Sequence, residues 1–439
     1  MRSVVSRKQS TGARGWTNPE RRWLLLIVVS GILLRLATAI LLGDNVVPLP
    51  AAYDQIYFHD VALNLLEGKG FAYSRPPWPF IQPLAPTAYT SFLYQIAIAG
   101  VYWIFGPHPL AARITQALIG SLLPWLIYGI VRRILRQPPV VEKQSQVVAL
   151  VAAGITAFYA YFIYFSATLM TDGPYLVTLA WALILTLDLA DQPTRWRWAM
   201  WGLAVGLAIL LRQVVLPVAG LLFVYIVWKA WQRVQWRHIL VAAGVIAALI
   251  LPWTVRNYLV FHRFLLLNSQ AGQVFWTANH PDLGTQWEYA PMFPIPADLQ
   301  GADEVTLNDE LMRRGLQVVV ENPGRFVQLS LSRLEMFFLF YPLPESSLFS
   351  NIARTFSFGI CLPFMAVGLV LSLQEWRRWL LLYLFIVAYT LIHIVSWVQI
   401  RYRMPIDMAL IPFAALTVVT LTNYVMQRVK RTENRWIKA

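Results

Sequence analysis

The chain has 439 residues, of which 58% are hydrophobic and only 13% are charged, and its mean hydropathy is +0.53. Soluble domains carry about 25% charged residues, so this composition excludes a soluble protein and predicts an all-α polytopic membrane protein. In a soluble chain the formal net charge of +14 would suggest nucleic-acid binding. Here the basic residues lie mostly in short segments between apolar runs, which is the pattern of the positive-inside rule. We therefore expect membrane lipids as partners and no nucleic acid.

Ten apolar runs come close to the roughly 20 residues that cross a hydrocarbon core as a helix. The predicted spans are residues 23–42, 112–135, 146–166, 173–191, 198–212, 214–231, 238–257, 350–373, 379–397 and 404–425. With a basic N-terminus in the cytoplasm, ten spans return the basic tail to the same side. Every loop on that side then carries Arg or Lys, as the positive-inside rule requires. Inside the first span, Arg35 is expected to face protein and to pair with an acid or a carbonyl.

Two further apolar stretches, residues 90–105 and 326–341, are not counted as spans, because a span at the first would place Arg132 and its basic neighbours outside. We expect both to form helices in the membrane interface. The predicted organisation is a cytoplasmic N-terminus (1–22), a transmembrane module (23–257) that includes the first outer loop (43–111), a large outer loop with a juxtamembrane helix (258–349), C-terminal transmembrane helices (350–425) and a cytoplasmic tail (426–439). Short inner loops and two large outer loops predict a multi-pass protein of a bacterial plasma (inner) membrane that works on its extracytoplasmic face.

Carboxylates and arginines from distant segments are predicted to meet at the outer membrane level. They are Asp54, Tyr57 and Asp60 in the first outer loop, with Arg113, Asp172, Arg212, Arg256, Asn257, Arg401 and Arg403 at outer ends of spans. Polar groups at membrane depth are costly and are usually functional or mutually paired. Arginine binds phosphate through two parallel hydrogen bonds and stabilises the charge that grows on a leaving phosphate. A carboxylate can take the proton of the attacking acceptor, so the set suits sugar transfer from a phosphate-linked lipid.

The stretch YDQIYFHDVALNLLEGKGF (53–71) resembles the first outer loop of the GT-C glycosyltransferase superfamily, and most closely the branch of protein O-mannosyltransferases and lipid A aminoarabinose transferases. The similarity continues through APTAY (85–89), LAARITQALIG (110–120), MTDGP (170–174), GLAVGLAILLR (202–212), PWTVRNY (252–258) and RYRMPI (401–406). The resemblance implies a GT-C-type fold of about ten transmembrane helices. It also implies an inverting transfer from a polyprenyl-phosphate monosaccharide to a lipid, glycan or protein acceptor. A divalent metal is compatible with this chemistry but not required, and no residue is assigned to one.

The resemblance further implies roles for individual residues. Asp54 matches the general base, and Asp172 matches a second acidic position that we also assign to catalysis. Arg113 matches an arginine that reaches the lipid phosphate. The other phosphate-binding candidates are Arg256 and Arg403, and the substrate-binding candidates are Asp60, Tyr57, Arg212, Asn257 and Arg401. Gln55 stands where the family usually has a second acid beside the base.

Each of these residues has a structural alternative. Asp60 can cap a helix, Asp172 can complement the dipole of the helix that it begins, and the arginines can anchor span ends at the interface. For the whole chain, one alternative is a non-catalytic carrier or flippase for lipid-linked sugars, which needs the arginines but not Asp54. Another is a scaffold in envelope assembly, and Gln55 is the feature that favours it.

Overall fold

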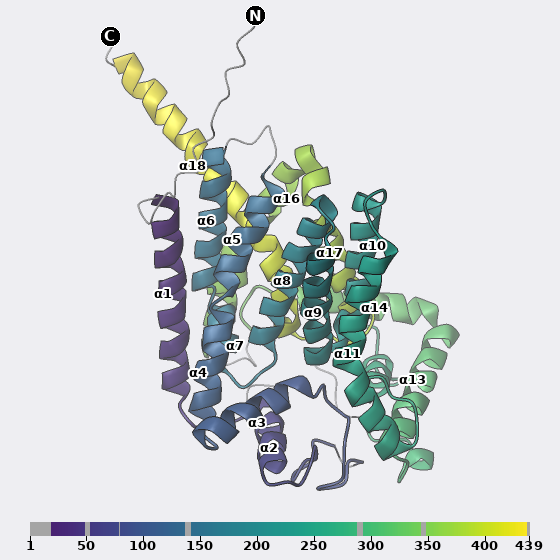
Figure 1. Cartoon of the computed structure of the whole chain (residues 1–439). Coiled ribbons are helices and arrows are strands. Elements are labelled where there is room, and N and C mark those ends of the chain that lie inside the picture. Colours follow the sequence, from purple (N-terminus) through teal and green to yellow (C-terminus); the bar gives the residue numbers. More distant parts are fainter. Residues whose placement is uncertain are drawn as a thin grey trace, which may run out of the picture.

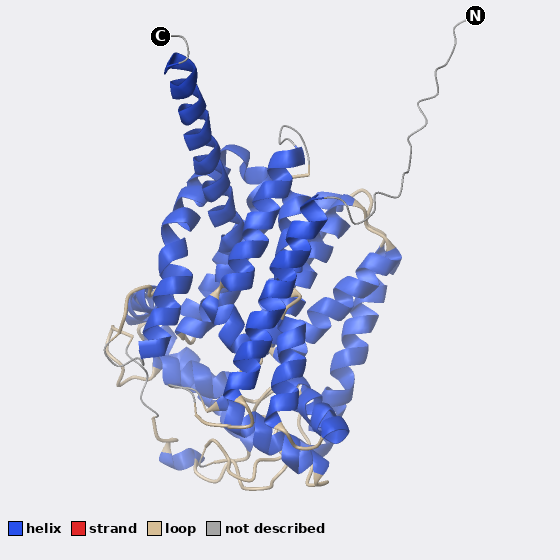
Figure 2. Cartoon of the chain, turned by 90° about the vertical axis from the view of Figure 1, so that its left-hand side faces the viewer, coloured by secondary structure: helices blue, strands red, loops and turns tan. Residues whose placement is uncertain are grey.

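The computed structural model describes residues 19–48, 53–78, 80–136, 142–287, 293–343 and 348–436. Within these ranges the chain consists of helices and loops and contains no strand (Figure 2). One isolated antiparallel bridge joins Ala72 to Pro86. The all-α prediction is therefore confirmed. The predicted N-terminus and tail are described only from Pro19 onward and up to Trp436.

Long apolar helices form a bundle whose members coincide with the ten predicted spans (Figure 1). In chain order they are α1 (Pro19–Leu42), α4 (Pro109–Gly120) with α5 (Leu123–Ile134), α6 (Glu142–Phe158) with α7 (Ala160–Ala167), α8 (Asp172–Asp191), α9 (Arg195–Leu211), α10 (Leu216–Ala230), α11 (Trp236–Phe261), α15 (Leu348–Arg354) with α16 (Ile360–Ser372), α17 (Trp376–Ile394) and α18 (Met404–Trp436). The two loops that are predicted to lie outside the membrane, which we continue to call the outer loops, contain α2 (Asp54–Leu66), α3 (Leu93–Phe105), α12 (Ala271–Asn279), α13 (Glu304–Glu321) and α14 (Pro323–Phe337).

By length and hydropathy, seven helical stretches of the described residues could cross a membrane, or eight if α6 and α7, which are bent by 52°, form one span. One of the seven stretches is Ser350–Ile394, but the chain reverses its direction within it. The hydroxyl of Tyr383 donates to the carbonyl of Leu369 at 3.3 Å, although these residues would lie about 21 Å apart along a straight helix. Helix α9 has 17 residues, one fewer than the shortest of these candidate membrane-crossing helices. The chain is a multi-pass membrane protein, and the number ten stays a prediction.

The loops gather at two ends of the bundle. Figure 1 shows α2, α3 and α13 at the lower end, with α3 lying across the bundle, and the end of α18 at the upper end. Arg132 and Arg133 lie in the last turn of α5, at the end away from α3. Helices α3 and α14 have 13 and 15 residues and are not counted as spans. Their interfacial placement stays a prediction.

Helix α1 lies at the edge of the bundle and is tied to it by one buried arginine. In the apolar part of α1 only 17% of the residues are buried, whereas the share is 72% in α8 and 78% in the stretch that contains α18. The guanidinium of Arg35 donates to the carbonyls of Gly31, Thr156 and Ala157 at 3.1–3.4 Å. The prediction that Arg35 faces protein and pairs with a carbonyl is confirmed, and its contacts join α1 to the end of α6.

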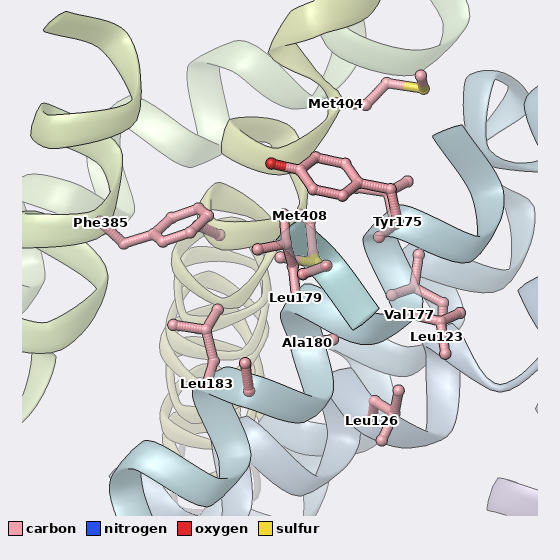
Figure 3. Close-up of a cluster of buried hydrophobic side chains, with 14 of the residues drawn as sticks. Leu123, Leu126, Tyr175, Val177, Leu179, Ala180, Leu183, Phe385, Met404 and Met408 are labelled. Carbon is pink, nitrogen blue, oxygen red and sulfur yellow. The ribbon is translucent and has the colours of Figure 1, made fainter. Parts of the chain in front are cut away.

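The central core places the beginnings of α8 and α18 side by side. Leu179 and Leu183 of α8 pack in one cluster with Phe385 of α17 and Met408 of α18 (Figure 3). Tyr175, one turn into α8, belongs to the same cluster and is fully enclosed. Because bulky side chains fill this interface, the outer ends of α8 and α18 cannot move independently. Both ends carry candidate site residues.

Candidate active site

Asp54, the predicted base, begins α2 and is bound by an arginine from the far end of the sequence. Its Oδ2 accepts a hydrogen bond from Nη2 of Arg401 at 2.8 Å, and the two residues are 347 positions apart. Arg401 lies in the 3-10 turn η5 (Ile400–Arg403), directly before α18. The Asp54 side chain is 35% exposed and that of Arg401 is 11% exposed. The pair is thus partly enclosed but still open to a ligand.

A second ion pair lies beside the first. Nη2 of Arg212, at the end of α9, is 2.8 Å from Oδ1 of Asp172, which begins α8. Nε of Arg212 also donates to the hydroxyl of Thr171 at 2.9 Å. Asp172 is only 2% exposed, and within the described residues its Oδ2 has no hydrogen-bond partner. A buried carboxylate oxygen that accepts no hydrogen bond costs folding free energy. This atom is therefore suited to accept a hydrogen bond from a hydroxyl group of a ligand.

Tyr402 connects the two ion pairs. The guanidinium carbons of Arg401 and Arg212 lie 5.2 and 5.3 Å from the centre of its ring. Both distances suit a cation–π contact. The two arginines also interact electrostatically with each other and with Asp172. Two carboxylates and two arginines from the first outer loop, α8, α9 and η5 therefore form one cluster, which we call the Asp54–Asp172 cluster.

Arg113 contacts Gln55, the neighbour of Asp54 in the chain, and is enclosed by protein. It is 1% exposed, and its guanidinium donates to the carbonyls of Ala167 and Asn45 at 3.1 and 2.7 Å. It also donates to Oε1 of Gln55 at 3.5 Å, while the Gln55 amide donates to the carbonyl of Val47. Gln55, at the position where the predicted resemblance expects a second acid, thus joins α2 to Arg113. In this arrangement Arg113 holds the start of α2 in place.

Arg256 and Asn257, near the end of α11, hold outer-loop backbone. Arg256 donates to the carbonyl of Thr87 at 2.9 Å and to Oδ1 of Asn257 at 3.1 Å, and it stacks on Trp253 at 4.7 Å. The Asn257 amide donates to the carbonyls of Leu265 and Leu267 at 3.1 and 2.9 Å. Among the described residues, neither side chain makes a hydrogen bond to the Asp54–Asp172 cluster.

Arg403, two residues after Arg401, is fully buried inside protein. Its Nε pairs with Asp407 at 2.9 Å, and its Nη1 donates to the carbonyls of Phe337 and Leu339, both at 2.9 Å. The other oxygen of Asp407 accepts from the hydroxyl of Tyr159 at 2.7 Å. These contacts join α18 to the end of α14 and the beginning of α7. They place Arg403 away from solvent, with 0% exposure.

The remaining first-loop candidates, Asp60 and Tyr57, lie on the outer surface of α2. Oδ2 of Asp60 accepts from the backbone N–H groups of Ser74 and Arg75 at 2.6 and 3.5 Å, so it fixes the loop after α2. Tyr57 packs edge-on against Tyr73 with ring centres 6.0 Å apart. Burial, together with nearby Tyr53 and Asp54, raises the pKa of the Tyr57 hydroxyl. Asp60 therefore has a structural role that is not the predicted one, because it binds loop backbone and does not cap a helix.

In three dimensions the chain resembles the crystal structure of the Archaeoglobus fulgidus oligosaccharyltransferase in the apo form. The TM-score is 0.52 at 14% sequence identity, over 95% of this chain and 52% of that one. The chain has a GT-C-type fold. The predicted resemblance is thus confirmed at the level of the fold. This chain spans about half the length of the oligosaccharyltransferase.

Part of the chain also matches a protein-family profile, and further solved structures resemble the chain. Residues 90–255 match the sequence profile of a family described as dolichyl-phosphate-mannose-protein mannosyltransferase. The oligosaccharyltransferase in complex with zinc and sulfate matches with a TM-score of 0.52 at 14% identity, over 91% of this chain and 50% of that one. ArnT from Cupriavidus metallidurans bound to undecaprenyl phosphate matches with a TM-score of 0.39 at 14% identity, over 90% of this chain and 78% of that one. No curated protein sequence matches the chain.

Sequence reasoning missed Glu304, which joins the two outer loops of this GT-C fold. Glu304 begins α13, and its carboxylate accepts from the hydroxyl of Thr87 at 2.7 Å, from the N–H of Ala88 at 3.0 Å and from the hydroxyl of Ser269. Burial raises the pKa of its carboxyl, and the three donors partly offset that effect. We call this set the Glu304 clasp. Two of its three partners, Thr87 and Ala88, lie within the APTAY motif (85–89), which was the one available signal.

Asp407 was missed for a different reason. It lies four residues after Arg403 in a segment read as a membrane span. An acid at that depth with a basic residue one helical turn before it indicates an ion pair, so the spacing was a usable signal. Across the described ranges, no three His, Cys, Asp or Glu side chains lie close enough together to hold a metal ion. We assign no residue to a metal.

Proposed function

We propose that the chain is an inverting glycosyltransferase that moves a monosaccharide from a polyprenyl-phosphate donor to a lipid, glycan or protein acceptor. The observation that carries the proposal is the convergence of Asp54, Asp172, Arg212 and Arg401 at one end of a GT-C-type bundle. The family whose profile matches residues 90–255 is named for dolichyl-phosphate-mannose, which is a polyprenyl-phosphate sugar. The cluster contains the two kinds of group that such a donor requires, a carboxylate base and phosphate-binding cations.

The reaction is a single displacement at the anomeric carbon of the donor sugar. An acceptor hydroxyl or amine attacks this carbon from the face opposite the phosphate, and Asp54 takes the proton as the new bond forms. The bond between the anomeric carbon and the phosphate oxygen breaks, and its electron pair stays on the leaving polyprenyl phosphate. Arg401 and Arg212 stabilise the charge that grows on that oxygen, which lowers the barrier because the interaction is strongest in the transition state.

Asp172 orients the donor in this proposal. Its Oδ1 holds Arg212, and its Oδ2 is buried without a partner in the described residues. A hydroxyl of the donor sugar supplies the missing donor group, which favours a sugar with a hydroxyl at that position. Asp172 therefore joins the phosphate-binding arginine to the sugar.

We assign the donor phosphate to Arg401 and Arg212 in preference to Arg113, Arg256 and Arg403. Guanidinium groups of the last three donate mainly to backbone carbonyls or to a buried carboxylate. Arg113 and Arg403 are fully buried, and a phosphate at either has to displace contacts that hold helices together, whereas the cluster arginines are partly exposed. Arg256 is also partly exposed, but a phosphate there has to displace the carbonyl of Thr87. Phosphate contacts of Arg113, Arg256 and Arg403 remain a prediction of the family resemblance.

We further propose that the cluster faces the extracytoplasmic side of a plasma (inner) membrane. The argument is the charge distribution, because the end opposite the cluster carries the basic inter-helix segments. At this face the cluster lies at the level where a polyprenyl phosphate exposes its headgroup. Lipid, glycan or protein acceptors then reach Asp54 from outside the membrane.

The test is transfer of radiolabelled sugar by the full chain in lipid nanodiscs, with a panel of polyprenyl-phosphate monosaccharides and membrane extract as acceptor. We expect Asp54→Asn to lower the rate by a factor of about 100 to 10,000, since a general base contributes this much. Glu67→Gln is the matched control, because Glu67 is an exposed acid after the same helix and pairs with Lys69. Donor binding without transfer in the native chain would instead support the carrier alternative or the scaffold alternative, of which the second is the one that Gln55 favours.

A further inference from the structure

The guanidinium of Arg401 has two oxygen partners and one weak sulfur partner. Nη2 is paired with Asp54 at 2.8 Å, and Nε donates to Oε1 of Gln399 at 2.8 Å. Nη1, in contrast, faces the thioether sulfur of Met170 at 3.7 Å. A thioether is a weak hydrogen-bond acceptor, so this edge of the guanidinium keeps most of its capacity to bind an oxygen ligand.

Asp54 in turn depends on Arg401. In the described residues the Arg401 contact is the hydrogen bond that the Asp54 side chain makes. While this contact is made, Oδ2 of Asp54 accepts the N–H of Arg401 and is not available to the hydroxyl or amine of an acceptor. The contact seen in the structure therefore opposes the role proposed for Asp54.

Neighbouring contacts allow Arg401 to change partners while the rest of the cluster stays in place. Arg212 is held by Asp172, Thr171 and the Tyr402 ring. The backbone of the η5 turn is held two residues later by Arg403 and its buried contacts with α14. Arg212 and the η5 backbone thus have contacts of their own that do not depend on the pair of Arg401 with Asp54.

We propose that Arg401 exchanges Asp54 for the phosphate of the lipid donor, so that the base is masked in the empty site and released when the donor binds. This inference rests on the proposed function. The two non-bridging oxygens of the donor's phosphodiester match the planar fork of a guanidinium and can be bound through two parallel hydrogen bonds, whereas Asp54 offers Arg401 one oxygen. The exchange imposes an order in which donor binding precedes proton transfer. It also prevents Asp54 from activating an acceptor or water before a donor is present.

The exchange makes a prediction about binding alone, because Asp54 and the phosphate compete for one arginine. We would measure the affinity of the full chain in nanodiscs for undecaprenyl phosphate, without a sugar and without turnover. Asp54→Asn removes the competitor and is expected to tighten binding about fivefold, the effect of a partly exposed ion pair worth about 1 kcal/mol. Arg401→Gln is expected to weaken binding. The double variant is expected to bind like Arg401→Gln alone, since the two residues act through one contact.

Control ligands and a control variant separate the sources of the signal. Undecaprenol lacks the phosphate and is expected to bind equally to the native chain and to Asp54→Asn, while inorganic phosphate tests whether the headgroup alone suffices. Glu67→Gln is the matched carboxylate control, because Glu67 is an exposed acid after the same helix and pairs with Lys69 and not with Arg401. Size-exclusion profiles confirm that each variant is folded.

The outcomes distinguish this inference from the proposed function. Unchanged or weaker binding of undecaprenyl phosphate by Asp54→Asn overturns the exchange, but it leaves the glycosyltransferase assignment standing if that variant has lost transfer. Absence of undecaprenyl phosphate binding in the native chain overturns both. Tighter binding in Asp54→Asn that persists in the double variant also overturns the exchange, because Arg401 is then not the shared partner.

Discussion

Arg401 and Arg403 stand two residues apart in the same 3-10 turn, and both pair with an aspartate at 2.8–2.9 Å. Arg403 and Asp407 are 0% and 1% exposed, and their contacts join α18 to α14 and α7. Arg401 and Asp54 are partly exposed, and one edge of Arg401 faces only a sulfur atom. The same chemical pair is therefore a structural tie in one place and a candidate ligand site in the other. The difference comes from what surrounds each pair, not from the residues themselves.

The sharpest way to test this comparison is to remove the buried arginine. Arg403→Met is expected to lower the free energy of unfolding by about 3–5 kcal/mol, because it leaves the Asp407 charge buried without a partner. Thermal unfolding of the detergent-purified chain measures the loss. The double variant with Asp407→Leu is expected to recover much of the stability, since no unpaired charge then remains. If Arg403→Met unfolds like the native chain, the pair is not the structural tie that its burial indicates.

Removal of Arg401 is expected to lower the rate of sugar transfer and to leave stability nearly unchanged. Arg401→Gln should reduce the sugar-transfer rate by a factor of about 100 to 1,000, the usual effect of losing one group that stabilises transition-state charge. Its thermal unfolding should stay close to that of the native chain, because Asp54 can reach water when its partner is lost. Transfer kinetics and unfolding are measured on the same preparation. Large losses of stability in both variants would erase the distinction between the two pairs.

A smaller effect is expected from the Glu304 clasp, which is structural but lies outside the membrane spans. Burial raises the pKa of Glu304 above its ordinary value of 4.5. The folded state therefore holds the proton more tightly than the unfolded state, and stability falls as the pH rises from about 4.5 through the raised pKa. Thermal unfolding between pH 4 and pH 7 should show this decline, and Glu304→Gln should flatten it. A native stability that increases with pH over that range, equally in the variant, would rule out this role.

Much of the architecture follows from local features of the sequence. Runs of about 20 apolar residues locate the helices, because a bilayer leaves the backbone no other partners than its own. Basic residues such as Arg132 and Arg133 sort the loops to two ends. The resemblance around residues 53–71 singled out Asp54, and its place at the start of α2 agrees with the spacing. These inferences need no knowledge of how the helices pack.

The roles of the individual arginines could not be read in the same way. Arg113, Arg256, Arg401 and Arg403 all stand near outer ends of predicted spans, and sequence position does not separate them. Each is assigned by its acceptors: carbonyls of Ala167 and Asn45 for Arg113, the Thr87 carbonyl for Arg256, Asp407 for Arg403 and Asp54 for Arg401. Those acceptors come from loops and helices that are distant in sequence.

By itself, the sequence determined the membrane class, the positions of the helices and a short set of polar candidates. Hydrophobic length and charge act locally, so each segment carries that information on its own. Only the tertiary structure decided which candidates meet. Asp172 comes close to Arg401 because the core packs the beginning of α8 against that of α18. Asp54 reaches Arg401 across 347 residues because α2 lies against the turn before α18. Whether an arginine ends among fixed carbonyls or beside an open carboxylate depends on that packing, since burial and neighbouring acceptors set what a charged group can bind.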